Sequence, residues 1–295
     1  MKMILIADSG STKTDWALVH CNATLSKRER PLHEGVALQA TFFTQGITPI
    51  HQSPDDIRQI LEQELLPQLG GHRETLSAVY FYGSGCTPAH IPTMEQLLKE
   101  TLSTDSVEVH SDLMAAARAL CGRDEGIACI LGTGANSCLY DGERMVQNTP
   151  ALGYILGDEG SGAVLGRCFM NAIFKNPAYA AIREEYLAEQ QLTMGDVIQH
   201  VYREPMANRF LASTSLYIGR HLDNPLLEEL VVDNFRQFFR RNIAPYQRPD
   251  LSVHFVGSMA QHYRNQLQQA AAAEGYAVGR ILKSPLEGLV AYHAA

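Results

Sequence analysis

Three glycine-rich segments lie at wide spacing in the 295-residue chain, and each follows a short apolar run. They are Asp8-Ser9-Gly10-Ser11-Thr12-Lys13-Thr14, Gly132-Thr133-Gly134-Ala135-Asn136 and Gly157-Asp158-Glu159-Gly160-Ser161-Gly162. A buried strand that ends in a turn of small residues lets backbone N–H groups approach an anion closely, as in phosphate-binding loops. In the first segment, Thr12 and Lys13 add side-chain donors. The chain is therefore expected to fold so that strands deliver phosphate-binding turns.

The second segment repeats the pattern of the first. Residues 3–7 and 127–131 are both short apolar runs, and each is followed by a glycine turn and then by a returning strand. After the second turn, Asp141-Gly142 predicts a hairpin that leads to a third strand through Met145. Two such units near the starts of two halves predict an internal duplication. A duplicated phosphate hairpin suggests two lobes that grip one nucleotide from opposite sides.

These motifs resemble those of the sugar kinase, heat-shock 70 and actin superfamily, and within it the BadF/BadG/BcrA/BcrD-type ATPase branch that includes N-acetylglucosamine kinase. The three segments are similar to that branch's two phosphate loops and its interlobe Gly-Asp-Glu-Gly-Ser motif. Val256-Gly257-Ser258-Met259 stands where the family places its adenosine loop. The resemblance covers essentially the whole chain, and the order of four motifs is specific although each alone is weak. It implies an α/β, two-lobed actin-like ATPase (ribonuclease H-like) fold with duplicated domains and an interlobe nucleotide cleft.

Composition excludes several classes of partner. The chain is 45% hydrophobic and 19% charged, which is an ordinary globular mixture and long enough for two domains. Its net charge of −8 and its lack of a Lys/Arg run give no reason to expect binding to nucleic acid or to a membrane. The N-terminal apolar run reaches Asp8 after five residues, too few for a signal peptide or a membrane span, so we expect a cytoplasmic protein.

The cysteines show no CxxC pair, and several lie inside apolar runs, where a reduced thiol packs like a small hydrophobic group. We therefore expect buried structural thiols and not metal ligands at Cys21, Cys86, Cys121, Cys129, Cys138 and Cys168.

Strands and helices alternate in the first half of the chain. Ser53-Pro54-Asp55-Asp56 is a helix start, with a capping serine, proline in the first turn and two acids at the positive end of the helix dipole. Beyond it, the sequence predicts strands at 78–82 and 107–109 and helices at 91–99 and 113–120. This alternation is typical of α/β layering.

The predicted domains are an N-terminal actin-like ATPase lobe, 1–125, and a C-terminal one, 126–295. The second lobe is expected to become mostly helical from Ser161, with a last strand at 251–256 and a helix at 259–273. Ser284-Pro285-Leu286-Glu287-Gly288 starts a final helix, which in the family packs back toward the first lobe.

The resemblance implies ATP and Mg²⁺ as cofactors. Asp8 matches the acid that holds Mg²⁺ through water, although its local sequence also suits a turn-forming Asx residue. Thr12 and Thr133 match two threonines that approach the phosphates, and Lys13 is either a partner of the γ-phosphate or a solvated loop lysine. The proposed nucleotide-binding residues are Ser11, Thr12, Lys13, Gly132, Thr133, Gly134, Gly257 and Ser258.

Asp112 is the candidate catalytic base. It lies where a strand gives way to a helix, and it matches the family aspartate that accepts the proton of the sugar hydroxyl. Its local sequence fits a second reading equally well, because an aspartate in a first helical turn also complements the helix dipole.

The resemblance also implies a set of sugar-binding residues. Asp158 matches a residue that hydrogen-bonds the sugar, and Gly83-Ser84-Gly85 matches a loop that faces it. Glu159 is expected to cap the helix that begins near Ser161. The candidate substrate-binding residues are Thr48, Ser84, Gly85, Ala135, Asn136, Leu152, Gly153 and Asp158.

Two departures from the family bear on the identity of the sugar. Thr48 stands where N-acetylglucosamine kinases carry an asparagine, and Leu152 stands where the animal enzyme has a tryptophan before Gly-His. The smaller side chain leaves room for a bulkier amino sugar such as N-acetylmuramic acid.

The leading reading is an ATP-dependent kinase of a free amino sugar, N-acetylmuramic acid or N-acetylglucosamine, in which two lobes close over the substrates. A second is an ATPase activator of an acyl-CoA dehydratase or reductase with an intersubunit iron–sulfur cluster, which needs interface thiolates. Cys129 and Cys138 lie in the second hairpin, but no clustered pair exists. A third is a nucleotide- or sugar-sensing binding protein, although such regulators usually append a DNA-binding module. A homodimer is expected from family analogy alone.

Overall fold

The computed structural model describes residues 2–20 and 38–294. Contacts divide the chain into two compact units: unit 1 comprises Met1–Arg123 and Ser284–Ala295, and unit 2 comprises Asp124–Lys283. The final helix, α13 (Leu286–Ala294), packs against the first strands of the chain and therefore belongs by its contacts to unit 1.

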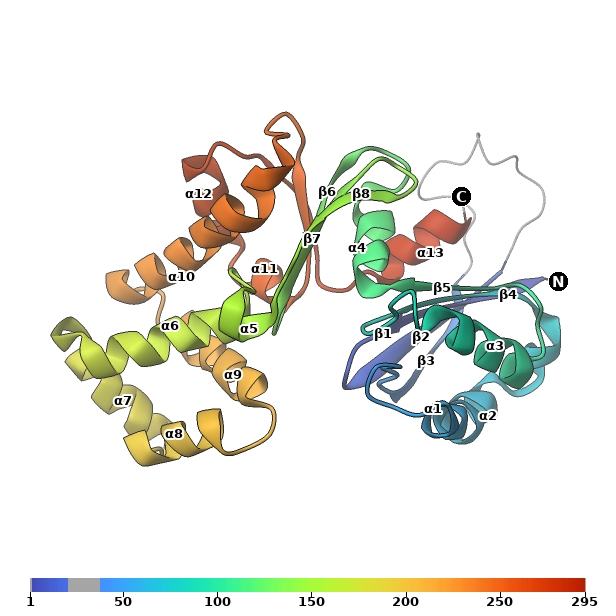
Figure 1. The fold of residues 1–295 in the computed structure, drawn as a ribbon, viewed down its shortest axis with the longest axis horizontal. Coiled ribbons are helices and arrows are strands. Elements are labelled where there is room, and N and C mark those ends of the chain that lie inside the picture. Colours follow the sequence, from blue (N-terminus) through green and yellow to red (C-terminus); the bar gives the residue numbers. More distant parts are fainter. Residues whose placement is uncertain (1, 21–37, 295) are drawn as a thin grey trace. The chain divides into compact units, whose positions relative to one another are not determined.

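Unit 1 is built on a mixed sheet, which has five strands within the described residues (Figure 1). The strand order is β3-β2-β1-β4-β5. The first three strands form an antiparallel meander, whereas β4 and β5 run parallel to β1. Because β1 is central and covered on both faces, it reads as a continuous apolar run. The strands are β1 (Met3–Ser9), β2 (Lys13–His20), β3 (Leu38–Gln45), β4 (Leu76–Gly83) and β5 (Val107–Ser111).

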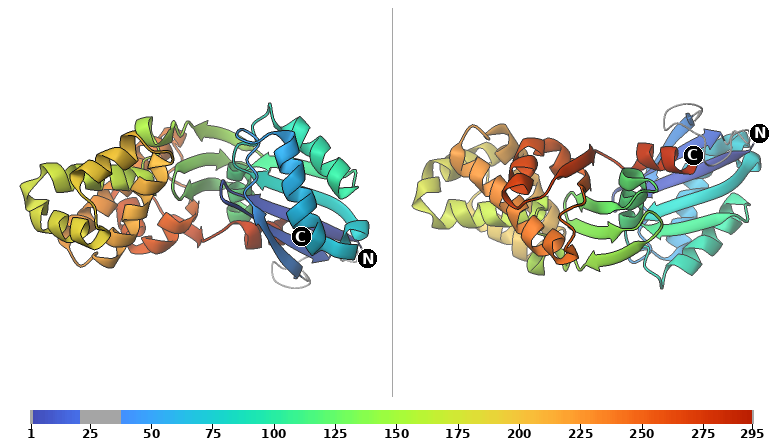
Figure 2. Two further views of the ribbon diagram at one scale, coloured as in Figure 1. Left: turned by 90° about the horizontal axis from the view of Figure 1, so that it is seen from below. Right: turned by 90° about the horizontal axis from the view of Figure 1, so that it is seen from above.

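Helices cover both faces of this sheet (Figure 2). One face packs against α1, which begins with the predicted capping box of Ser53 and Asp56, and against α3. The other face is covered by α4 and α13, which pack against each other. The elements are α1 (Pro54–Ile60), the π-helix η1 (Leu61–Leu65), α2 (Leu66–Leu69), η2 (Gly70–Thr75), α3 (Ile91–Leu102) and α4 (Asp112–Cys121).

Unit 2 repeats the strand connectivity of unit 1. Its described residues form a five-stranded sheet of order β10-β9-β6-β7-β8, in which β6-β7-β8 is an antiparallel meander. Strands β9 and β10 run parallel to β6, as β4 and β5 do to β1. The predicted duplication and the α/β class are therefore confirmed. The strands are β6 (Gly126–Leu131), β7 (Ala135–Tyr140), β8 (Met145–Thr149), β9 (Val253–Val256) and β10 (Val278–Leu282).

The rest of unit 2 is mostly helical, as expected. Helix α6 packs against α9 and α10, and α10 packs against α12, around a core rich in phenylalanine. The elements are α5 (Gly153–Leu156), α6 (Gly162–Lys175), η3 (Pro177–Tyr179), α7 (Ala180–Gln190), α8 (Met194–Tyr202), α9 (Ala207–Arg220), α10 (Pro225–Phe238), the π-helix η4 (Phe239–Ile243), η5 (Ala244–Tyr246), α11 (Ser258–His262) and α12 (Arg264–Ala273).

Two predictions about unit 2 need correction. The strand at 251–256 is not the last one, because β10 follows it and pairs with β9 at the edge of the sheet. The helix expected over 259–273 is interrupted at Tyr263, whose φ of −104° and ψ of 34° are not helical, so two helices replace one.

The described cysteines are free thiols, as predicted. Four of them are buried, Cys86, Cys121, Cys129 and Cys138, and Cys168 is half-buried. Cys21 lies outside the described residues. None of the helices in the described part of the chain is long and apolar enough to cross a membrane.

Candidate active site

In unit 1, the predicted site residues gather at the edge of the sheet where three parallel strands end. Ser9 of β1 lies beside Gly83 of β4, and Gly83 lies beside Ser111 of β5. This register brings the neighbours of those residues, Asp8 and Asp112, to the same edge. The carboxyl ends of parallel strands are where open α/β sheets bind their ligands.

The first glycine turn is held tightly against a second segment. The N–H of Gly10 donates to the carbonyl of Lys13 at 3.0 Å, and the N–H of Gly46 donates to the carbonyl of Thr12 at 3.1 Å. A Cβ added to Gly46 would lie 2.4 Å from the carbonyl oxygen of Gly10, so the backbone at Gly46 packs directly against the backbone of the first glycine turn. Ser11 and Thr12 are exposed at the tip of this turn, where a phosphate could reach their N–H groups.

Lys13 is engaged with its own strand. Its Nζ lies 3.0 Å from the carboxylate of Asp15 and 5.6 Å from the centroid of the Phe43 ring. The side chain is largely exposed, so a partner phosphate would compete with an exposed ion pair that contributes little stability.

Asp8 sits in an acidic environment. Burial, together with the nearby carboxylates of Asp15 and Asp112, raises the pKa of its carboxyl to about 7. The hydroxyl of Ser284, 3.4 Å from Oδ2 of Asp8, and the charge of Lys13 act in the opposite direction. A nearby cation would stabilise the charged form of a carboxyl whose pKa is raised in this way.

This donor set fits a hydrated Mg²⁺. The described residues contain no cluster of three or more His, Cys, Asp or Glu side chains that could cage a metal. Mg²⁺ usually keeps several waters and is bound through one or two carboxylates together with substrate phosphates. Asp8, at the end of β1 beside the first glycine turn, is placed for that role.

Asp112 is the first residue of α4, but it does not cap that helix. The cap is Ser111, whose Oγ accepts a hydrogen bond from the N–H of Met114 at 3.3 Å. Asp112 Oδ1 accepts from the N–H of Leu113 at 2.9 Å, and the carboxyl is recessed among protein atoms. Burial raises the pKa of Asp112, and this backbone N–H lowers it. A carboxyl with a raised pKa is a better proton acceptor once it is ionised.

Two of the predicted substrate segments meet in unit 1. A Cβ on Gly85 would lie 3.0 Å from Cγ2 of Thr48, and the N–H of Ser84 donates to the carbonyl of Ser9 at 3.0 Å. Thr48 is only 6% exposed, and its hydroxyl has no hydrogen-bond partner among the described residues. The Gln52 side chain accepts from the Thr48 N–H at 2.6 Å and donates to the Gly46 carbonyl, which ties this segment to the first glycine turn.

In unit 2, the second glycine turn lies against the start of α6. The N–H of Gly162 donates to the carbonyl of Gly132 at 2.8 Å, and the N–H of Ala163 donates to the carbonyl of Thr133 at 3.2 Å. The turn itself closes through the N–H of Gly132 and the carbonyl of Gly134. Glycine turns and helix N-termini both present N–H groups that favour anions.

Asp158 reaches this turn from the third glycine-rich segment. Its backbone is left-handed, with a φ of 54°, and the residue is 9% exposed. Its Oδ2 lies 3.1 Å from where a Cβ on Gly134 would be, and the N–H of Ala135 donates to the carboxylate. Burial raises the pKa of Asp158 to about 6, the Ala135 N–H lowers it, and Glu159 raises it. Asp158, Gly134 and Ala135 thus form one cluster.

The prediction that Glu159 caps α6 is wrong. The cap is Ser161, whose Oγ accepts from the N–H of Val164 at 3.1 Å. Glu159 instead lies 3.3 Å from Nη1 of Arg241 and from Nδ2 of Asn242, which belong to the π-helix η4. These partners are more than 80 residues away in the sequence, which gives no sign of the contact.

Leu152 and Gly153 lie at the start of α5, an exposed single turn of helix. Leu152 is 64% exposed, and its neighbours Ile155 and Leu156 are exposed as well. Arg167 fixes this turn by donating from Nη1 to the carbonyls of Tyr154 and Ile155, at 2.7 and 2.8 Å.

Asn136 is engaged within the sheet. Its Oδ1 accepts from the N–H of Ser137 at 2.9 Å and from Nδ2 of Asn148 at 3.0 Å. A substrate contact from Asn136 would therefore use the Nδ2 group or displace one of these bonds.

Gly257 directly follows β9 and packs against the end of β6. Its φ of 125° suits glycine, and a Cβ there would lie 2.3 Å from the carbonyl oxygen of Leu131, the residue before Gly132. Its N–H donates to the carbonyl of Leu282 at 3.0 Å. Ser258 is exposed at the start of α11. The proposed adenosine turn and the second phosphate turn are therefore neighbours.

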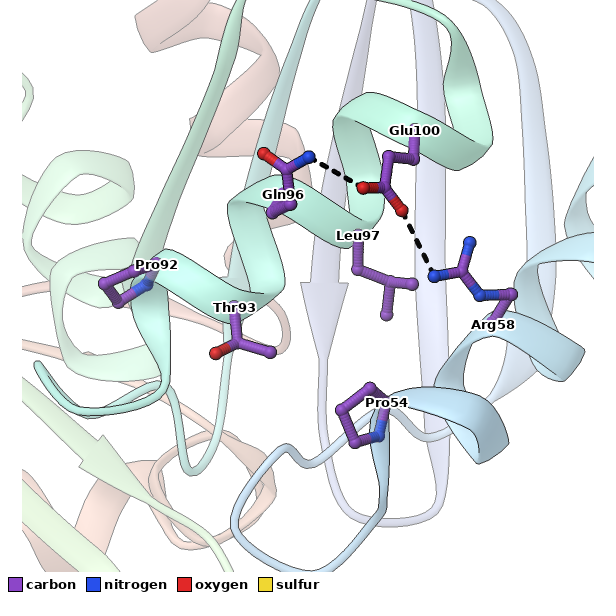
Figure 3. Close-up of a pocket in the computed structure, with 7 residues that line it drawn as sticks. All are labelled: Pro54, Arg58, Pro92, Thr93, Gln96, Leu97 and Glu100. Atoms are coloured by element: carbon purple, nitrogen blue, oxygen red, sulfur yellow. Dashed lines mark hydrogen bonds and ion pairs between the residues drawn. The ribbon is translucent and has the colours of Figure 1, made fainter.

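A separate groove lies between α1 and α3 and has a volume of about 430 Å³ (Figure 3). The ion pair of Arg58 and Glu100, 3.2 Å apart, crosses between the two helices. None of the predicted site residues lines it. The residues that do are Pro54, Arg58, Pro92, Thr93, Gln96, Leu97 and Glu100.

Sequence reasoning missed two residues that contact or face Asp8. Asp15 pairs with Asp8 across the β1–β2 hairpin, and the three-residue turn between the strands would have predicted that register. Ser284 reaches Asp8 from the other end of the chain, and no local signal indicates such a contact.

Comparison with known proteins gives one strong match. The chain is 46% identical to a candidate N-acetylglucosamine kinase from Porphyromonas gingivalis, with a TM-score of 0.86 and 99% of each chain covered. A second candidate N-acetylglucosamine kinase, from Chromobacterium violaceum, is 18% identical with a TM-score of 0.65 over 99% of each chain, and it supports the fold alone. Component A of the (R)-2-hydroxyglutaryl-CoA dehydratase of Acidaminococcus fermentans is 12% identical with a TM-score of 0.45, over 99% of this chain and 96% of that one, which carries no argument. No protein-family model and no curated protein matches the chain.

Proposed function

Because the chain belongs to the N-acetylglucosamine kinase-like branch of the BadF/BadG/BcrA/BcrD-type ATPases, with their actin-like ATPase fold, we propose that it is an ATP-dependent kinase of a free amino sugar. The 46% identity over essentially the full length of both chains supports a sugar kinase. The amino-sugar specificity and the role of each residue follow from the resemblance of the motifs to the family and are proposals.

The observation that carries the catalytic assignment is the placement of Asp112. Its carboxyl lies at the sheet edge that also holds Asp8, and Ser111 supplies the side-chain cap of α4, while Asp112 also complements the helix dipole from the first turn. We assign Asp112 as the base. As the sugar oxygen bonds to the γ-phosphorus and the bond to the bridging oxygen breaks, Asp112 takes the hydroxyl proton and ADP leaves.

The remaining residues bind and orient the substrates. The first glycine turn with Ser11, Thr12 and Lys13 and the second with Gly132 to Gly134 offer donors to the phosphates, while Gly257 and Ser258 border the adenosine. Asp8 would hold Mg²⁺ through water, and the ion would neutralise charge on the phosphates. Asp158 would accept a hydrogen bond from a sugar hydroxyl.

We propose N-acetylmuramic acid or N-acetylglucosamine as the sugar. Thr48 offers a buried hydroxyl with no partner, where a longer asparagine would reach further. Leu152 is exposed beside two further apolar side chains, where a tryptophan would cover more of the surface. Both substitutions favour a sugar that carries a further substituent such as the lactyl ether.

The test is a comparison of kcat/KM for N-acetylmuramic acid, N-acetylglucosamine and glucose at saturating ATP and Mg²⁺. We expect glucose to be roughly 10–100-fold poorer, because the missing amide leaves polar groups unpaired. Leu152→Trp should shift preference toward N-acetylglucosamine. Strong preference of the unaltered protein for N-acetylglucosamine over the muramyl sugar would exclude the assignment of the bulkier substrate.

The structure argues against the iron–sulfur alternative. Cys129 and Cys138 lie on neighbouring strands, β6 and β7, and both are fully buried in unit 2. A cluster shared between subunits needs thiolates at the surface of each subunit. A colourless protein purified without air would agree with this reading. A homodimer stays a proposal that light scattering can test.

A further inference from the structure

The last turn of α13 is fixed to unit 1 through His293. Nε2 of His293 lies 2.7 Å from the hydroxyl of Tyr82, which also lies 2.7 Å from Nη1 of Arg118. The His293 ring stacks on the Tyr80 ring, with centroids 3.7 Å apart and planes 23° apart. The imidazole of His293 thus contacts β4 directly and is linked to α4 through Tyr82 and Arg118.

The hydrogen bonds of Tyr82 are compatible with a neutral His293. Arg118 has only donors, so the Tyr82 oxygen accepts from it. The single hydroxyl proton of Tyr82 is then free to be donated to Nε2 of His293. An imidazole that accepts at Nε2 is neutral and carries its proton on Nδ1.

The charges around His293 oppose a second proton on the ring. Helix α4 and the turn after it contribute Arg118 and Arg123, and β5 contributes His110 with its partner Glu108. The other neighbouring groups are uncharged tyrosines: Tyr80 and Tyr82 of β4, and Tyr292 of α13, which stacks against Arg123 at 4.7 Å. The titratable side chains of β1 and β2, which also pack against α13, are Asp8, Lys13, Asp15 and His20.

The opposite end of the same segment touches the candidate active site. Ser284 Oγ lies 3.4 Å from Oδ2 of Asp8 and also accepts from the N–H of Leu286 at the start of α13. Between the two ends, Gly288 packs so closely on α4 that a Cβ would lie 2.5 Å from the carbonyl oxygen of Ala119. Docking of α13 and the position of Ser284 are therefore linked.

We propose that α13 is a pH-sensitive latch: neutral His293 holds the helix on unit 1, and protonation of this imidazole releases the helix and withdraws Ser284 from Asp8. The latch does not depend on the reaction that the protein catalyses. Stacking on Tyr80 would favour a charged ring, but the two arginines and the loss of the Tyr82 hydrogen bond act against it.

The difference between the pKa values of His293 in the docked and in the released helix determines how strongly, and in which direction, the release of α13 depends on pH. Burial, together with the charges of Arg118, His110 and Arg123, lowers the pKa of His293 to about 3. In the released helix the imidazole would titrate near its ordinary pKa of about 6.5. Protonation of His293 therefore has almost no effect on the release of α13 at pH 8, but it favours release as the pH falls below 6.5. The equilibrium constant for release is about 30-fold larger at pH 5 than at pH 8.

Hydrogen exchange of the α13 amides, corrected for the intrinsic effect of pH, measures this release directly. The intact chain should show about 30-fold more opening at pH 5 than at pH 8. His293→Gln keeps an acceptor for Tyr82 and gains no charge, so its opening should not change with pH. His72→Gln, at an exposed histidine of the same unit, is the matched control and should behave like the intact chain.

His293→Lys provides a second arm, because it places a permanent charge at the site. It should open α13 at pH 8, and circular dichroism and exchange in the sheet strands would show that the rest of unit 1 stays folded. Equal pH dependence in the intact chain and in His293→Gln would overturn the proposal. So would opening of α13 in the intact chain that is no greater at pH 5 than at pH 8.

Discussion

The Asp158 carboxyl is almost fully buried, and its burial raises its pKa to about 6. A carboxyl whose pKa is higher in the folded chain than in the unfolded chain costs stability as the pH rises from about 4 through 6. Asp158→Asn removes that cost, keeps an acceptor for the Ala135 N–H and suits the left-handed backbone. We expect it to stabilise the fold by about 1–3 kcal/mol at pH 7.

Urea unfolding at pH 7 and at pH 4.5 checks this prediction, because the gain should shrink as the carboxyl of the unaltered protein becomes protonated. The same variant should bind sugar more weakly, since the carboxylate is our proposed sugar contact. Equal stability of the two proteins at pH 7 would show that Asp158 carries no buried charge.

Asp112 is the residue on which the proposed chemistry depends. Asp112→Asn should lower kcat by about 10²–10⁴-fold, because the amide cannot accept the hydroxyl proton. The affinity for ATP, measured by calorimetry, should be unchanged. The exposed Asp105→Asn in the same unit is the matched control. Near-full turnover in Asp112→Asn would remove this residue from the mechanism.

At the scale of an element, the first phosphate turn depends on the segment that supports it. A Cβ on Gly46 would lie only 2.4 to 2.7 Å from backbone atoms of the turn, which leaves no room for a side chain. Gly46→Ala should therefore displace the turn, raise the KM for ATP and cost about 1–3 kcal/mol of stability. Gly71→Ala, where a Cβ meets open space, is the control and should change neither quantity. Unchanged ATP kinetics in Gly46→Ala would show that the turn does not bind nucleotide.

The sequence predicted the central strands and missed two edge strands. The β1 and β6 runs are apolar because they are buried on both faces, and that pattern is local. Strands β3 and β10 lie at sheet edges and are largely exposed, so no apolar run marks them. Their conformation comes from pairing with β2 and β9, which is a tertiary effect.

The candidate site likewise contains turns that the sequence predicted and contacts that it did not predict. The turns at Gly10, Gly132 and Gly257 were visible because glycine chemistry is local. The contacts of Glu159 with η4 and of Ser284 with Asp8 join residues far apart in sequence. Only the fold brings such pairs together.

For the whole molecule, duplication explains why the two glycine turns occupy equivalent positions in their two units. Each unit places a turn after the first strand of a meander, and two parallel strands extend the sheet on the other side of that strand. We propose that the turn of each unit binds phosphate. Gly257→Ala, which would place a Cβ 2.3 Å from the carbonyl oxygen of Leu131 beside the turn of unit 2, and Gly46→Ala should then each raise the KM for ATP, whereas neither would affect it if the nucleotide bound elsewhere.

The central claim is that the protein transfers phosphate from ATP to a free amino sugar. Mass spectrometry of the products after incubation with ATP, Mg²⁺ and N-acetylmuramic acid or N-acetylglucosamine tests it directly. We predict a sugar phosphate formed in equal amount to ADP, and its loss in Asp112→Asn. ADP release without any sugar phosphate, or no turnover with either sugar, would contradict the claim.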